Sequence, residues 1–162
     1  MKLRKITAAA VFCALLAVLS QIVLPLPGGV PLTLQTFAVA LCGFCLGQKN
    51  GLLAVGAYLL LGGVGLPLFS SFGGGIGWLL GPTGGFLWGF LPLIFCCGLR
   101  KYPIAFGGLA ACHLLGLIQF ALVTGNSLWQ AFLVASLPYL AKDALSLVAA
   151  RWLAKRLPRK FF

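Results

Sequence analysis

The feature that most constrains this chain is the absence of charged residues over three long stretches, at 6–48, 50–99 and 102–141. A helix needs about 20 mostly apolar residues to cross the hydrocarbon layer of a membrane, and each stretch exceeds that length. Over the whole chain 8% of the residues are charged and 61% are hydrophobic. Since a soluble domain has roughly 25% charged residues, these side chains cannot cover a surface that faces water. The sequence predicts one integral membrane domain over residues 1–162.

The basic residues are distributed as expected for a membrane protein. Lys and Arg number 12 against one acidic residue, for a formal net charge of +11, which by itself could suggest nucleic-acid binding. Their positions argue otherwise, because they form short clusters between apolar stretches, and such clusters mark the cytoplasmic side of membrane proteins. We therefore expect a multi-pass protein of the cell membrane and no nucleic-acid partner.

Proline and glycine divide the apolar stretches into six predicted helices, at 6–24, 32–48, 51–66, 82–98, 103–123 and 138–156. The predicted fold is an all-α membrane protein with six transmembrane helices and both termini in the cytoplasm. This topology places every basic residue except Lys142 on the cytoplasmic side. A seventh crossing at 128–136 would put the basic tail outside, so that segment is expected to be a short helix at the outer face.

The three outer connections, 25–31, 67–81 and 124–137, are longer than the inner ones and carry no charge. Irregular backbone at membrane depth is tolerated only where it is packed in protein or lines a cavity. A ligand site is therefore expected at the outer end. The glycines at 73–75 permit unusual backbone angles and close approach, so we interpret 67–81 as a lid, with Gly74 and Trp78 near the ligand.

Asp143, the single acidic residue, is the strongest candidate for a ligand contact. A carboxylate within a membrane segment is costly and by default marks a functional site. The simpler alternative is an Asp that favours the helix dipole or reaches water. Lys142 precedes it, but successive helical side chains point about 100° apart. We therefore expect the two side chains not to satisfy each other fully, and each to meet one end of a polar ligand.

Other candidates lie at the predicted outer ends of helices. Thr33 and Gln35 can hydrogen-bond a ligand, although helix capping and helix–helix hydrogen bonds explain them equally well. Thr83 stands at a helix start whose free N–H groups suit polar ligand groups. Trp78 and Tyr139 are expected either as interface anchors or as stacking partners of the ligand. His113 is more simply interpreted as a packed side chain.

Groups for catalysis are scarce in the sequence. It has no GxxxxGK[ST] phosphate loop, and one acid with one His leaves little for acid–base chemistry. Cys42 and Cys45 form a CxxC without the second pair of ligands that a zinc site needs. We expect no metal, no cofactor and no enzymatic activity, but a binding and passage unit whose energy comes from elsewhere.

Four motifs give the chain a resemblance to the BioY family, the biotin-capturing S components of energy-coupling factor transporters. They are VPLTLQTFAV (30–39), GLLAVGAYLLLGGVGLPLF (51–69), GGGIGWLLGPTGG (73–85) and PYLAKDALS (138–146). The resemblance covers nearly the whole chain. It implies a six-helix S component of a prokaryotic plasma membrane. The biotin pocket would lie near the outer face, formed by the first outer loop, the glycine-rich loop and the start of the last helix.

The resemblance also implies roles for individual residues. Asp143 matches the family's acidic residue in the last helix, and a carboxylate is a strong acceptor for the two N–H groups of biotin's ureido ring. The family often has a lysine three residues later, where this chain has Ser146, so the partner of biotin's carboxylate stays open. Ala10 and Ala14 match the small residues on the first helix that dock on the transmembrane T component, which couples to two cytoplasmic ATPases.

Two alternative functions are compatible with the same residues. One is an S component for a different vitamin, since pocket chemistry alone does not identify the ligand. The other is a structural membrane subunit without a ligand, which the glycine-rich outer connection and the lone acidic residue disfavour.

Overall fold

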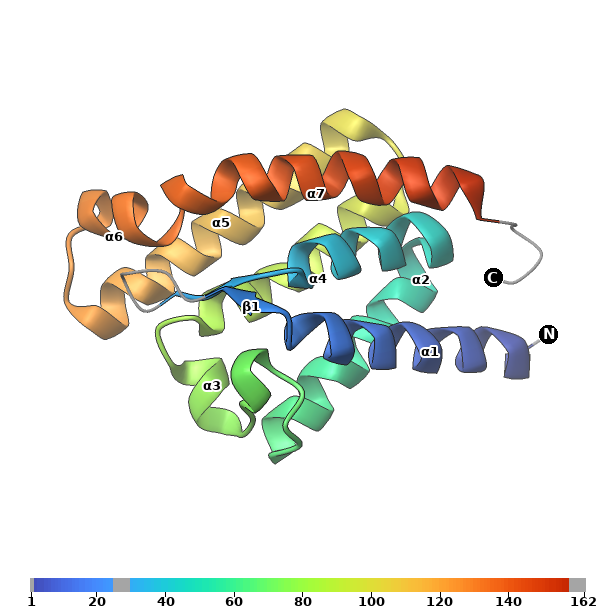
Figure 1. Ribbon diagram of the computed structural model, residues 1–162, viewed down its shortest axis with the longest axis horizontal. Coiled ribbons are helices and arrows are strands. Elements are labelled where there is room, and N and C mark those ends of the chain that lie inside the picture. The colour runs from blue at the N-terminus through green and yellow to red at the C-terminus, as the bar shows by residue number, and fades with distance from the viewer. Residues whose placement is uncertain (1, 25–29, 158–162) are drawn as a thin grey trace.

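The computed structural model describes residues 2–24 and 30–157 as an elongated bundle of helices (Figure 1). Both termini lie at the same end of the bundle. The helices of the described part are α1 (Lys2–Ser20), α2 (Gln35–Val64), α3 (Ile76–Leu80), α4 (Gly84–Gly98), α5 (Tyr102–Thr124), α6 (Leu128–Ala135) and α7 (Leu137–Arg156). A 3₁₀ turn, η1 (Ser70–Phe72), and two short strands, β1 (Val23–Leu24) and β2 (Leu32–Thr33), complete it.

The first helix ends earlier than predicted, at Ser20 rather than residue 24. The chain continues as β1, which pairs antiparallel with β2 through Val23 with Thr33 and Leu24 with Leu32. The fold is therefore mostly helical rather than strictly all-α, because of this small hairpin. The side chains of Ser20 and Gln21 bond the backbone of the lid at Leu68 and Phe69. The turn predicted around Pro25, Pro27, Gly28 and Gly29 lies outside the described residues.

The predicted helices 32–48 and 51–66 form one element, α2, which reverses direction at Gly47. Its first arm, residues 35–46, runs toward the termini, and its second arm, residues 48–64, runs back (Figure 1). The separate loop expected near Lys49 is wrong, because the backbone of Gly47 (φ 75°, ψ −175°) makes the turn in one residue, a conformation that favours glycine. Arg100 completes the turn by donating from Nε and Nη2 to the carbonyl oxygens of Phe44 and Cys45, each at 3.0 Å.

Helices α4 and α5 approach each other closely at two glycines of α4, Gly85 and Gly89. A Cβ at Gly85 would lie 2.3 Å from the carbonyl oxygen of Leu115, and one at Gly89 would lie 2.7 Å from the Cα of Cys112. The bounds of α4, α5 and α7 lie within two residues of the predicted ones. This close contact supports the wall of the site described below.

The short helix predicted at 128–136 is α6, which begins with a capping box between Ser127 and Gln130. It lies at the end of the bundle opposite the termini (Figure 1), and a bend of 52° separates it from α7. Among the described residues, α1, α2 and α5 are long and apolar enough to cross a membrane, and α6 with α7 would make a fourth candidate.

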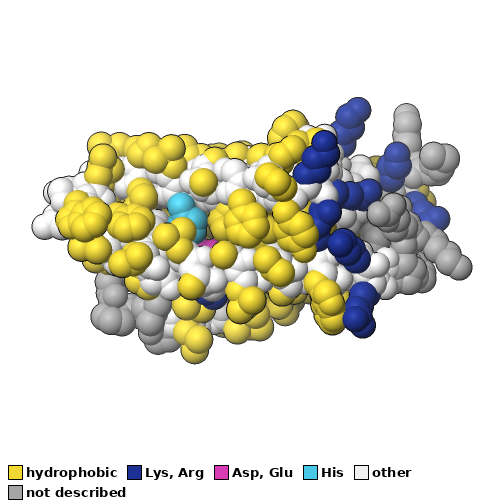
Figure 2. Space-filling view, turned by 90° about the horizontal axis from the view of Figure 1, so that it is seen from above, with side chains coloured by type: hydrophobic (Ala, Val, Ile, Leu, Met, Phe, Trp, Pro, Cys, Tyr) yellow, Lys and Arg dark blue, Asp and Glu magenta, His cyan; other side chains and the backbone are white. Residues whose placement is uncertain are grey.

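Most Lys and Arg side chains form a band around the end that holds the termini, here called the basic end (Figure 2). The rest of the visible surface is largely apolar, with the histidine and the single carboxylate set away from the band. The band has the pattern that the positive-inside rule expects at a cytoplasmic boundary.

Candidate ligand-binding site

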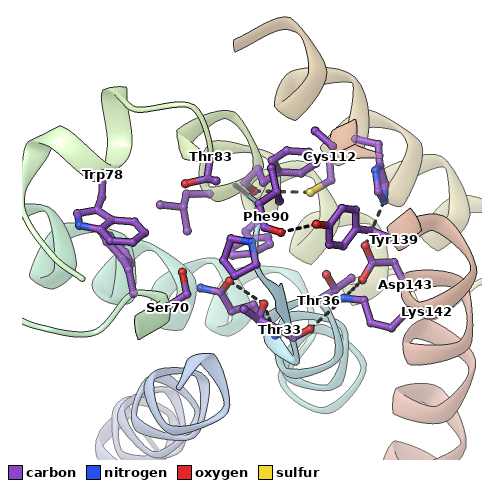
Figure 3. Close-up of a pocket in the computed structure, with 18 residues that line it drawn as sticks. Thr33, Thr36, Ser70, Trp78, Thr83, Phe90, Cys112, Tyr139, Lys142 and Asp143 are labelled. Carbon is purple, nitrogen blue, oxygen red and sulfur yellow. Dashed lines mark hydrogen bonds and ion pairs between the residues drawn. The ribbon is translucent and has the colours of Figure 1, made fainter. Parts of the chain in front are cut away.

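A cavity opens away from the basic end, between β2, the starts of α2, α4 and α7, the middle of α5, and the lid (Figure 3). Its atom-free space is about 620 Å³, a value that includes open space at its mouth. Seven of the eight predicted ligand contacts line it, namely Thr33, Gln35, Trp78, Thr83, Tyr139, Lys142 and Asp143.

Gly74 is not among the residues that line the cavity, so the geometry does not support its predicted ligand contact, which stays a prediction. A Cβ there would lie 2.3 Å from the carbonyl oxygen of Leu66, so the missing side chain lets the lid pack on its own backbone. Gly73 has a similar role, because a Cβ there would meet the indole ring of Trp78 at 2.2 Å. Of these lid glycines, Gly75 has the positive φ, 95°, that favours glycine.

Asp143 is buried, at 5% relative exposure, and is paired on both sides. Its Oδ1 forms an ion pair with Lys142 Nζ, and its Oδ2 lies 3.2 Å from His113 Nε2. The expectation that Lys142 and Asp143 do not satisfy each other fully agrees with these contacts, because each side chain also has another partner: His113 for Asp143 and the carbonyl oxygen of Thr33 for Lys142. The lysine side chain is long enough to fold back onto its neighbour, and a carboxylate left unpaired in these apolar surroundings would be costly.

Lys142 also connects α7 to β2, because its Nζ donates to the carbonyl oxygen of Thr33 at 2.9 Å. The hydroxyl of Tyr139, one helical turn earlier, donates to the carbonyl oxygen of Val30. Tyr139 is 5% exposed and its ring lines the cavity (Figure 3). These two bonds hold the chain around β2 against α7.

His113 is the residue that sequence reasoning undervalued. It is buried, lines the cavity and contacts both Asp143 and Ser136, whose Oγ lies 2.9 Å from Nδ1. A neutral imidazole that donates from Nε2 to Asp143 can accept from the Ser136 hydroxyl at Nδ1. One signal could have found the pair. The only acid and the only histidine of an apolar chain are each other's most suitable partners.

Gln35 and Thr33 form a second polar group on the cavity wall, next to Lys142. Gln35 Nε2 donates to the Tyr58 hydroxyl at 2.8 Å, and Thr33 Oγ1 donates to Gln35 Oε1 at 2.9 Å. The hydrogen bond to Tyr58 joins the two arms of α2. The helix–helix interpretation of Gln35 is thus correct, and the position of both residues on the cavity also leaves ligand contact open.

The rest of the wall is apolar and was not singled out from the sequence. Phe69, Phe86, Leu87 and Phe90 line the cavity beside Trp78. In a chain where most residues are apolar, nothing local distinguishes a phenylalanine on a cavity from one that faces lipid. The arrangement suits a small ligand with an apolar body and polar groups at its ends.

Two glutamines fix the lid over the cavity, one at each end. Gln21, just after α1, donates from Nε2 to the carbonyl oxygen of Phe69 at 3.0 Å and accepts the N–H of Phe72 at 2.8 Å. Gln119 of α5 donates to the carbonyl oxygens of Leu79 and Gly81, both at 2.8 Å. At the first tie the backbone is irregular, with positive φ at Ser71 and Phe72, and α3 lies between it and the second tie.

Comparisons with known proteins agree with one another. The BioY family profile matches residues 1–161. The chain is 38% identical over 161 residues to the probable biotin transporter BioY of Pyrococcus horikoshii, covering 97% of this chain and 98% of that protein. It is 39% identical over 166 residues to the biotin transporter BioY of Thermotoga maritima, covering 97% of each.

A solved structure is similar over nearly the whole chain. It is the crystal structure at 2.1 Å of the S-component for biotin from an ECF-type ABC transporter, with a TM-score of 0.82 and 26% identity. The match covers 96% of this chain and 90% of that one. By the profile, the relatives and the fold, this chain belongs to the BioY family.

Proposed function

We propose that this chain captures biotin and carries it into the cell as the S component of an ECF-type transporter. Relatives that are 38% and 39% identical to this chain are named biotin transporters. The family is one of transporters rather than enzymes. The observation that carries the proposal is the apolar cavity that ends at a buried, paired carboxylate, Asp143.

The cavity's chemistry fits biotin group by group. Asp143 would accept the N–H donors of the ureido ring, and ionised acceptors form the stronger hydrogen bonds. Lys142 and His113 keep that carboxylate compensated while the site is empty. The aromatic side chains of the wall would exclude water from the apolar part of the ligand, under the lid that Trp78 closes.

The proposal includes a membrane arrangement as a single domain. The six crossings would be α1, the two arms of α2, α4, α5 and α7, with the basic end in the cytoplasm. The band of Lys and Arg side chains in Figure 2 supports this orientation, and the cavity and α6 would then lie toward the outer face. This count of six crossings treats the reversal at Gly47 as a turn between two of them.

Import then needs partners that this chain does not supply. We infer that Ala10 and Ala14, which are exposed on α1, dock on a transmembrane T component coupled to two cytoplasmic ATPases. Small residues permit close helix approach, which supports α1 as the contact. The sequence has no phosphate loop of its own, so the energy for transport would come from those ATPases.

The test is ligand-induced stabilisation of the purified full chain. Biotin should raise the melting temperature of the wild type by mass action. Asp143→Asn, which keeps the shape but removes the charge, should weaken binding by roughly 10- to 100-fold, the worth of a hydrogen bond to a charged group. Normal biotin binding by Asp143→Asn would overturn the role of this carboxylate. Stabilisation by another vitamin, or by none, would favour one of the two alternative functions.

A further inference from the structure

A second cavity lies at the basic end, and it shares no lining residue with the proposed biotin site. It is formed by the end of the first arm of α2, the turn between α4 and α5, and the last turns of α7. Three cations line it: Arg100, Arg151 and Lys155. Its atom-free space is about 450 Å³, including open solvent. Nothing in the proposed binding of biotin uses these residues.

The protein itself holds two of the cations in place. The Arg151 guanidinium lies over the ring of Tyr102 at 4.5 Å and over that of Phe44 at 5.3 Å. Arg100 is fixed by its two hydrogen bonds to the first arm of α2, and its backbone has a φ of 59°, costly for a residue with a side chain. A ligand that binds such pre-positioned cations loses less side-chain entropy.

No carboxylate side chain of this chain can neutralise the cluster. The only acidic residue, Asp143, is paired with Lys142 and His113 at the other cavity. Within the described ranges 2–24 and 30–157, Arg151 Nε is buried and has no hydrogen-bond partner. Three positive charges around a cavity, one with an unused donor, form a site for an anion.

We propose that this cavity binds the phosphate of an anionic phospholipid headgroup in the cytoplasmic leaflet. The site lies at the basic end, where the protein meets the headgroup region. On the same helix, Val148 exposes apolar surface along which acyl chains can lie. Basic pockets between helices on the cytoplasmic side are suited to such headgroups. The inference depends on the membrane orientation given above, but not on which ligand the outer cavity takes.

The experiment measures lipid bound to the purified full chain by native mass spectrometry. Phosphatidylglycerol is titrated against phosphatidylcholine, with inorganic phosphate as a separate arm. The variants Arg151→Gln and Lys155→Gln each remove one lining charge. Arg156→Gln is the matched control, because Arg156 is on the same helix and carries the same charge but packs on Trp152, at 4.2 Å, and does not line the cavity.

The wild type should retain phosphatidylglycerol in preference to phosphatidylcholine, and each lining variant should bind it about 5-fold more weakly. The control should bind like the wild type. Lys155→Gln keeps the proposal testable if Arg151→Gln fails to fold, since Lys155 takes no part in the aromatic packing. Equal retention of the two lipids, or equal losses in Arg156→Gln and the lining variants, would overturn the site. Displacement of phosphatidylglycerol by millimolar phosphate would make it a site for a soluble anion and overturn the lipid assignment.

Discussion

At the scale of single residues, the site depends on how one buried charge is compensated. Asp143 is held between Lys142 and His113, and a buried carboxylate without partners is unstable in a membrane protein. The sequence was sufficient to select Asp143, because it is the only acid in the chain. The sequence was not sufficient to identify the partners of Asp143. The angle between successive helical residues gives only the Cα–Cβ directions, and a long lysine side chain can fold back toward its neighbour.

Lys142→Met should destabilise the protein, because it removes one partner of a buried ion pair and leaves the carboxylate undercompensated. The expected loss is about 3 kcal/mol in the free energy of unfolding, measured by thermal or denaturant unfolding in detergent. Lys5→Met is the matched control, since Lys5 is an exposed lysine on α1 and its loss should have little effect. The double variant Lys142→Met with Asp143→Asn should recover much of the stability, and failure to recover would contradict the pairing.

At the scale of elements, the lid behaves as a segment held at two points. Gln21→Leu should increase amide hydrogen exchange over residues 68–73, because the N–H of Phe72 loses its acceptor. Gln119→Leu should do so around 79–84, where it frees the carbonyl oxygens of Leu79 and Gly81. Each variant is the control for the other. If either substitution loosened the whole lid equally, the two ties would not be independent.

The packing of α4 on α5 makes a sharper prediction. Gly89→Ala should cost about 2 kcal/mol, because its Cβ would press on the backbone of Cys112 at 2.7 Å. Gly107→Ala on α5 should leave stability unchanged or raise it by up to ~1 kcal/mol, since a Cβ there meets nothing within 4 Å. Melting temperatures of the two variants, measured side by side, provide the test. Equal effects on the two melting temperatures would mean that helix propensity, and not close packing, determines the stability of these variants.

Some of these elements could be predicted from the sequence, and others could not. Proline and glycine, with the lengths of the apolar runs, located α4, α5 and α7 to within two residues. The reversal at Gly47 was misplaced because a charge, Lys49, is a visible signal, whereas a single left-handed glycine inside an apolar run is not. The β hairpin was missed because its strands, Val23–Leu24 and Leu32–Thr33, are two residues long and too short to show an alternating pattern in an apolar chain.

At the scale of the whole molecule, the two ends have different chemistry. One carries the basic band (Figure 2) and the other carries the connections that build the ligand cavity. The positive-inside rule could predict this polarity from the sequence. Which aromatic side chains form the cavity wall could not be predicted, because it follows from helix rotation in the assembled bundle.

Ala14→Trp should impair assembly with a T component and biotin uptake, yet leave biotin binding intact, because the exposed face of α1 is remote from the cavity residues. Ala110→Trp is the matched control, since Ala110 is an exposed alanine on a different helix, α5. Co-purification and uptake by cells would be measured for both variants. Normal assembly of Ala14→Trp would exclude this face of α1 as the docking surface.

The double closure of α2 has a consequence for biogenesis. Gly47 joins the two arms at one end, and the hydrogen bond from Gln35 to Tyr58 joins them at the other. The part of the wall that Gln35 and Thr36 supply can therefore form within a stretch of 30 residues, as soon as the ribosome has released it. The charged end waits for α7, because Tyr139 and Lys142 bond residues 109 positions earlier. A nascent chain that stops before Leu137 has a formed α2 hairpin but no charged end to its pocket, so ligand binding becomes possible only after α7 has been synthesised.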